Sequence, residues 1–378
     1  PARRAARRRR RRVVGSAAAM GNVSSLIDES SKRHRGRYLR VQATKIKADK
    51  ADSLTEKVNK AIGATIRVLE VSECRLKAPP KSVVHLAHLR RLSVTRNLLE
   101  TLPDDMSPLA QLQVVEVSRN AFSKFPLGVL TLPKLAALDV SYNKMQSLGA
   151  AFTATSAAPG TLRTLVLRGN KFTSFPVQIC AVTTLRHLDL AYNGMLLLAD
   201  QLGELRELEE LLLRGNALAD LTPDLGQLGK LRVLDIAANR LSSVPREICA
   251  LMALERLDAS HNALSLLPNE VCHLISLREL RWANNGVRVV PPQIGDLEKL
   301  EELDLAENFL ETLPRQLATC VSLRKLYVEY NALAELPADL GRLPRLLLLC
   351  AHNNELRDVS PLTRLTTLVS VALDHNPF

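Results

Sequence analysis

Leucines and a single asparagine return along this chain with a period of 23 residues. The repeated pattern is LxxLxLxxNxL, and one copy of it consists of Leu300, Leu303, Leu305, Asn308 and Leu310. The asparagines of the series are Asn97, Asn120, Asn143, Asn170, Asn193, Asn216, Asn239, Asn262, Asn285, Asn308, Asn331, Asn354 and Asn376. Only two intervals deviate, 27 residues before Asn170 and 22 before Asn376. A fixed period of this length predicts an array of stacked structural units.

Each part of the pattern predicts a structural element. The central LxL alternates with period two, which predicts a short strand whose leucines face the interior. The asparagine follows at a bend, where its amide can satisfy backbone groups of the turning chain. The second half of a unit has apolar residues at helical spacing after a proline, as in Val244, Pro245, Ile248, Leu251 and Leu254. One unit cannot bury this many apolar residues, so neighbouring units must stack on it.

These residues resemble the leucine-rich repeat family, in particular its intracellular 23-residue class with LPxxI in the second half, as in Ras-suppressor and Scribble-type proteins. The LP signature stands at Leu102-Pro103, Phe125-Pro126, Phe175-Pro176, Val244-Pro245, Leu267-Pro268, Leu313-Pro314 and Leu336-Pro337. A degenerate first copy has Cys74 in place of asparagine, which gives about 14 repeats over residues 64–378. The resemblance implies an α/β solenoid, a horseshoe with a parallel concave β-sheet and short helices or 3-10 turns on the convex side.

The basic charge of the chain lies before the repeats. The whole chain is +12, whereas residues 1–20 contain eight arginines without an acid, and residues 21–61 contain ten basic and five acidic residues. The repeat array is therefore close to neutral, at about −1. We interpret residues 1–20 as a low-complexity Arg/Ala segment and residues 21–52 as a basic flexible segment. Residues 53–63 are predicted to form a capping helix, because Ser53 and Glu56 make a capping box.

The basic flank also contains a motif for lipid attachment. Met20-Gly21-Asn22-Val23-Ser24-Ser25 fits the N-myristoylation pattern, in which the acylated glycine follows the initiator methionine. The hypothesis requires Met20 to be the true start, and it competes with a chance match and with an arginine-rich mitochondrial transit peptide.

A single myristoyl chain binds membranes only marginally, so a second signal is expected. Basic residues downstream of Gly21 could supply it by attraction to an anionic membrane surface. They are Lys32, Arg33, Arg35, Arg37, Arg40, Lys45, Lys47 and Lys50. The alternative is an ordinary solvated basic linker.

The search for chemistry in the sequence returns little. It contains no phosphate-binding GxxxxGK, no GxSxG and no HExxH motif. The six cysteines include no CxxC pair, and the cysteine-rich end caps of extracellular members of the family are missing. We therefore predict a cytoplasmic protein without catalytic activity, cofactor or metal, with its cysteines buried as small apolar residues.

Residues four positions before each asparagine are predicted to face outward from the sheet. Seven of these fourteen residues are acidic, which favours a basic partner. Arginines, tyrosines and interruptions of the acidic row are candidates for specificity, because tyrosine and arginine often anchor interfaces. The candidate partner-binding residues are Tyr142, Arg168, Tyr192, Leu212, Arg214, Asp235, Asp258, Arg281, Tyr327 and Tyr330.

The sequence thus predicts a monomeric protein-binding scaffold, tethered to the cytoplasmic face of a membrane through Gly21 and the basic segment. The family resemblance implies a small GTPase or a phosphatase complex as partner, but no residue selects either. Two alternatives remain open. One is a regulatory subunit of such a complex, and the other is nucleic-acid association through the arginine-rich flank, which the nearly neutral repeats disfavour.

Overall fold

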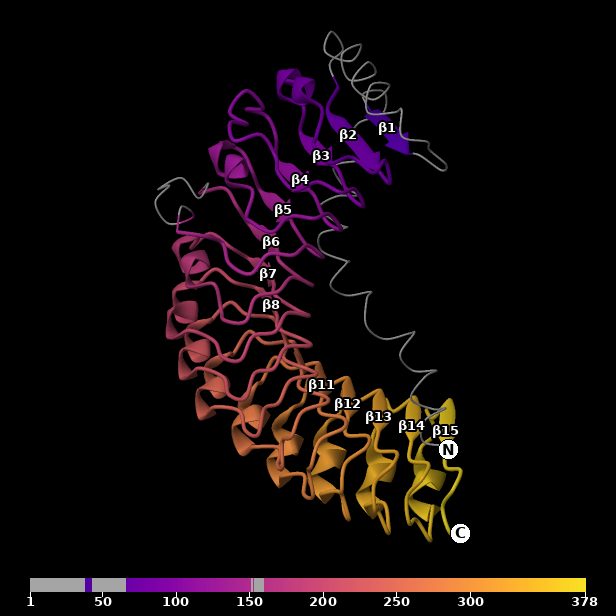
Figure 1. Ribbon diagram of the computed structural model, residues 1–378. Helices are drawn as coiled ribbons and strands as arrows, with labels where there is room; N and C mark the ends of the chain where they lie inside the picture. Colours follow the sequence, from indigo (N-terminus) through magenta and orange to yellow (C-terminus); the bar gives the residue numbers. More distant parts are fainter. Residues whose placement is uncertain (1–37, 43–65, 151, 153–159) are drawn as a thin grey trace. The chain divides into compact units, whose positions relative to one another are not determined.

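The computed structural model describes residues 38–42, 66–150, 152 and 160–378, which fall into two compact units. Unit 1 comprises Pro1–Asn170 and unit 2 comprises Lys171–Phe378. In each unit, short parallel strands line one side and 3-10 helices line the other (Figure 1).

In unit 1, six strands pair in chain order and in parallel. They are β1 (Tyr38–Gln42), β2 (Val68–Ser72), β3 (Arg91–Ser93), β4 (Val114–Glu116), β5 (Ala137–Asp139) and β6 (Thr164–Val166). The 3-10 helices are η1 (Lys81–His85) and η2 (Leu127–Thr131). Strand β1 lies within residues 21–52, for which the sequence analysis predicted no strand. The predicted capping helix at 53–63 lies outside the described residues.

In unit 2, nine strands pair in the same way. They are β7 (His187–Asp189), β8 (Glu210–Leu212), β9 (Val233–Asp235), β10 (Arg256–Asp258), β11 (Glu279–Arg281), β12 (Glu302–Asp304), β13 (Lys325–Tyr327), β14 (Leu348–Cys350) and β15 (Ser370–Ala372). The 3-10 helices are η3 (Val177–Ala181), η4 (Asp200–Glu204), η5 (Pro223–Gln227), η6 (Arg246–Ala250), η7 (Asn269–His273), η8 (Pro292–Asp296), η9 (Arg315–Thr319), η10 (Ala338–Arg342) and η11 (Ser360–Arg364). These elements confirm the predicted solenoid with 3-10 turns.

The core of each unit lies between the strands and the 3-10 helices. The leucine in the middle of each strand and the apolar residue two positions later point into it, as Leu257 and Ala259 do in β10 and just after it. Trp282 occupies such a core position and is 0% exposed, as the sequence predicted. Apolar residues of the 3-10 helices, such as Ile248, close the core from the other side.

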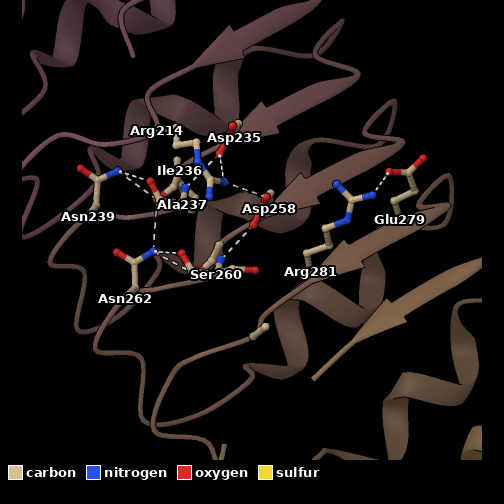
Figure 2. A network of polar contacts seen from close by, with 12 residues as sticks. Arg214, Asp235, Ile236, Ala237, Asn239, Asp258, Ser260, Asn262, Glu279 and Arg281 are labelled. Carbon is tan, nitrogen blue, oxygen red and sulfur yellow. Dashed lines mark hydrogen bonds and ion pairs between the residues drawn. The ribbon is translucent and has the colours of Figure 1, made fainter. Parts of the chain in front are cut away.

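The asparagines bind the backbone of two successive repeats. Asn239 Nδ2 donates to the carbonyl of Leu213 in the preceding repeat at 3.1 Å and to that of Ile236 at 2.9 Å (Figure 2). Its Oδ1 accepts from the backbone N–H of Leu218, again in the preceding repeat, at 3.1 Å. One side chain therefore satisfies donors and acceptors that the bend removes from water.

The residue before each asparagine makes the turn possible. It has a positive φ in every described repeat, for example 54° at Tyr142 and Tyr192 and 57° at Tyr330. Glycine occupies this position at Gly169 and Gly215, where a left-handed conformation has no steric cost. Elsewhere, a side chain accepts the strained backbone because the asparagine network fixes the turn.

Among the described residues, we find no helix of a length and hydropathy that would allow it to cross a membrane.

Replacing Asn239 with alanine should lower the free energy of unfolding by roughly 2–4 kcal/mol, because several buried backbone groups lose their partner at once. Urea denaturation followed by circular dichroism measures this loss. Arg240→Ala is the matched control, since Arg240 is the exposed next residue, and it should change stability by less than ~0.5 kcal/mol. Equal losses in the two variants would contradict the role assigned to the asparagine.

Candidate functional site

The outward face of the strands displays two residues from each strand, the first and the third. The sequence analysis singled out only the third position, although the same period-two alternation also places the first residue outward. In unit 1, outward side chains of β3, β4 and β6 are buried. In unit 2, those of β9 to β12 are half-buried. The accessible part of this face is therefore found in unit 2.

Five aspartates of the predicted acidic row have a structural task. Each accepts a hydrogen bond from the backbone N–H two residues later, where the strand ends and its ladder no longer uses that donor. The pairs are Asp139 with Ser141 (2.8 Å), Asp189 with Ala191 (2.9 Å), Asp235 with Ala237 (3.0 Å), Asp258 with Ser260 (3.0 Å) and Asp304 with Ala306 (3.1 Å). Much of the acidic row therefore serves the fold itself.

Arg214, Asp235 and Asp258 form a cluster that joins three successive repeats of unit 2 (Figure 2). Arg214 Nη1 lies 3.2 Å from Asp258 Oδ2 and 3.8 Å from Asp235 Oδ1. The three side chains are 22%, 20% and 24% exposed for Arg214, Asp258 and Asp235, respectively. The cluster is thus partly shielded but open on one side.

Burial and the neighbouring carboxylate of Asp258 raise the pKa of Asp235 to about 7, and the opposing attraction of Arg214 does not cancel them. For Arg214, burial acts to lower the pKa, but Asp235 and Asp258 outweigh it, so that the pKa lies above its usual value. The cluster therefore contains more negative charge than its arginine compensates.

A second cluster centres on Arg281 and Glu302. Arg281 Nε donates to Glu302 Oε1 at 3.0 Å, and Lys325 Nζ donates to Glu302 Oε2 at 3.1 Å. Arg281 also points toward Glu279, to which its Nη2 donates at 3.2 Å (Figure 2). Burial works to raise the pKa of Glu302, but the two cations lower it below its usual value. Tyr327 lies beside this cluster, and burial and Glu302 raise the pKa of its hydroxyl.

Two tyrosines and two arginines that the sequence singled out separately form two similar pairs. In unit 1, Arg168 Nε donates to the Tyr142 hydroxyl at 3.1 Å. In unit 2, Arg214 is hydrogen-bonded to Tyr192. Each tyrosine ring lies against the glycine that follows its arginine. A Cβ on Gly169 would come within 2.6 Å of the Tyr142 ring, and one on Gly215 within 2.7 Å of the Tyr192 ring.

The remaining candidates lie apart from these groups. Tyr330 is exposed and makes an edge contact with His352, with ring centroids 5.1 Å apart. Leu212 is only 6% exposed and so offers a partner little surface. Gly21 and the basic residues from Lys32 to Lys50 lie outside the described residues, except Arg40, whose backbone belongs to β1 and is paired in register with Glu70.

The sequence analysis missed a row of alternating charges. It occupies the residue just before each strand of unit 2 from β7 to β13, seven positions before the asparagine. The row reads Arg186, Glu209, Arg232, Glu255, Arg278, Glu301 and Arg324. Its ion pairs include Arg186 with Glu209 at 3.2 Å, Arg232 with Glu255 at 2.7 Å and Arg278 with Glu301 at 2.6 Å. Comparing the same position in successive repeats would have revealed it.

The first outward position of the strands was missed as well. In unit 1, Arg91 Nη2 lies 2.9 Å from Glu116 Oε2 and both side chains are buried. In unit 2, His187 Nδ1 lies 2.9 Å from Glu210 Oε2. Both pairs join adjacent strands at this position.

The described part of the chain holds no group of three or more histidine, cysteine, aspartate or glutamate side chains that could bind a metal ion. The six cysteines are free thiols. Burial raises the pKa values of Cys180, Cys272 and Cys320 to about 12, so these thiols stay protonated and unreactive at neutral pH.

Comparisons with known proteins agree with this architecture. The family model described as "Leucine-rich repeat region" matches residues 222–310, and the one described as "Leucine Rich repeat" matches residues 183–195. A search of the curated proteins finds no match.

Solved structures of leucine-rich repeat proteins share the fold. A leucine-rich repeat protein of Leptospira interrogans is 24% identical, with a TM-score of 0.59 over 82% of this chain and 97% of that one. An internalin of Listeria monocytogenes is 18% identical, with a TM-score of 0.70 over 84% and 94%. The ectodomain of the Arabidopsis thaliana receptor kinase GASSHO1/SCHENGEN3, in complex with Casparian strip integrity factor 2, is 24% identical, with a TM-score of 0.68 over 82% and 38%. Fold and family matches together support a leucine-rich repeat protein.

The raised pKa of Asp235 predicts a pH-dependent stability. Because the folded state holds this proton to a higher pH than the unfolded chain, stability should fall as pH rises from the usual aspartate range through about 7. Asp235→Asn removes the charge and keeps an acceptor for Ala237. It should therefore raise the melting temperature at pH 8.5 by roughly 1–3 °C and leave it little changed at pH 5.

Differential scanning calorimetry at the two pH values measures this difference. Asp304→Asn is the matched control, because Asp304 accepts the same kind of backbone hydrogen bond in β12. A gain for Asp235→Asn that is the same at both pH values would rule out the electrostatic explanation.

Proposed function

We propose that this protein is a non-catalytic scaffold or adaptor that binds a protein partner through the outward face of its unit 2 strands. The observation that carries the proposal is the pair of half-buried clusters on that face, around Arg214 with Asp235 and Asp258 and around Arg281 with Glu302. Partly shielded charges of both signs are suited to specific recognition, since a partner that covers them must match their arrangement.

The structural neighbours add support for a protein partner. The Arabidopsis ectodomain was solved with its peptide-named factor bound, and another plant receptor in this fold is a peptide hormone receptor in complex with RGF2. These neighbours are below 25% identity, so they support the mode of function and not the partner. The resemblance to intracellular LPxxI repeats favours a small GTPase or phosphatase complex, in which this chain would be an adaptor or a regulatory subunit.

We further propose that the chain is tethered to the cytoplasmic face of a membrane. Support comes from the myristoylation pattern at Gly21, followed by eight basic residues between Lys32 and Lys50. Acyl chain and basic segment would bind weakly by themselves and stably together.

The tether predicts that Gly21→Ala abolishes incorporation of a myristate analogue and moves the protein from the membrane fraction to the soluble fraction. Expression from Met20 with an azide-bearing myristate analogue, followed by fractionation, measures both effects. Ser24→Ala keeps the glycine and is a control for the position of the change. Unaltered membrane association of Gly21→Ala would end the tether proposal.

The partner surface predicts that Arg281→Ala combined with Tyr327→Ala removes partners that wild-type protein captures in cells, because both residues lie on the proposed face. Quantitative proximity labelling compares the variants. The control combines Arg246→Ala and Arg315→Ala, which change exposed residues of η6 and η9 on the other side of the repeats. The scaffold proposal fails if the same partners are lost from both variants or from neither.

A further inference from the structure

The outward face of β7 to β10 holds more hydrogen-bond acceptors than donors. Its carboxylates come from four successive strands, and its cations are two arginines. The acceptors are Asp189, Glu210, Asp235 and Asp258, and the cations are Arg214 and Arg256. An excess of carboxylates alone does not define a binding site, because solvent can satisfy it.

A second observation on the same face is independent of the carboxylates. His187 is 4% exposed, and its Nε2 is one of the few buried side-chain atoms in the described chain without a hydrogen-bond partner. Its Nδ1 faces Glu210 at 2.9 Å. Since a carboxylate only accepts, Nδ1 must carry the proton, and Nε2 of the neutral ring is then an acceptor. A buried acceptor without a donor has a free-energy cost that a ligand N–H would remove.

His187 and Asp189 project from the same face of β7, because they are two residues apart on a strand. Beyond them on the neighbouring strands, Asp235 and Asp258 flank the guanidinium of Arg214, which lies nearer to Asp258 by 3.2 Å against 3.8 Å. Asp235 is therefore the less compensated carboxylate. Its raised pKa has the same cause.

We propose that this face recognises an arginine of the protein partner, with the guanidinium set against Asp235 and Asp258 and an N–H of the same segment donating to His187 Nε2. The inference rests on the proposed function, since it names what the surface recognises. Arginine fits better than lysine, because its planar fork of five donors can serve two carboxylates at once, whereas an ammonium is a point charge.

The proposal has a consequence for pH. A second cation beside Asp235 favours its charged form, so binding releases a proton and should tighten as pH rises from 6 to 8. The groups that face Asp235 from the neighbouring strands are Asp189, Glu210, Arg214, Asp258 and His187. Protonation of His187 would turn Nε2 into a donor, which weakens binding at low pH and acts in the same direction.

The test uses the full chain at 150 mM salt and a defined probe, the peptide acetyl-Gly-Arg-Gly-Arg-Gly-amide. Its matched control replaces both arginines with citrulline, which keeps the shape and removes the charge. Binding is followed by calorimetry and by the Cε1–H resonance of His187. We expect the arginine peptide to bind at least ~10-fold more tightly than the citrulline peptide and to shift the His187 resonance. We also expect its affinity to rise several-fold between pH 6 and pH 8.

Three variants locate the site. Asp235→Asn should abolish the pH dependence, His187→Gln should weaken binding, and Asp304→Asn should leave binding unchanged. Equal binding of the arginine and citrulline peptides would overturn the proposal, and so would an equal effect of Asp235→Asn and Asp304→Asn. If His187→Gln does not fold, the comparison of wild type with Asp235→Asn still decides. Continued capture of partners by a protein that does not bind the arginine peptide would reject this inference and leave the scaffold proposal intact.

Discussion

The structure depends on one constraint, which is that backbone groups removed from water at every turn must find a partner. The asparagine of each repeat meets it by using both ends of its amide, and it does so across two repeats, as Asn262 does for Leu241 and Ile236. Few other side chains can donate and accept in this way. In the first repeat, Cys74 shows what a substitute provides, because its thiol donates only to the carbonyl of Ser72 at 3.2 Å.

Because the asparagines hold the turns, the outward positions of the strands are freer to vary. This freedom is incomplete, since the aspartates also cap the strand ends and the ion pairs join neighbouring repeats. A residue on this face therefore has neighbours from two other repeats, and its charge and pKa are properties of the stack. Asp235 and Asp304 occupy the same position and make the same backbone hydrogen bond, yet Arg214 and Asp258 flank the first, whereas Arg281 and Tyr327 flank the second.

The sequence was sufficient for those features that recur in every repeat. It predicted the buried leucines, the core position of Trp282, the turns on the far side and the outward direction of Asp235, Asp258 and Arg281. It did not predict β1, because Tyr38–Gln42 has no repeat pattern and joins the sheet only through pairing with β2. The pairing of Arg214 with Asp258, 44 residues later, also escaped it. Such a contact depends on which rotamer bridges two strands, and periodicity contains no information about rotamers.

The alternating row from Arg186 to Arg324 has a consequence for how the array can change in length. Every charge in it faces the opposite charge in the next repeat, so the row distinguishes odd from even numbers of repeats. Loss of the single repeat that contains Glu255 would bring Arg232 beside Arg278, whereas loss of two successive repeats would restore the alternation. Each exposed pair contributes only about 0.2–1 kcal/mol, but the sign changes for every such junction. The row therefore imposes a parity on the growth and shortening of this part of the solenoid.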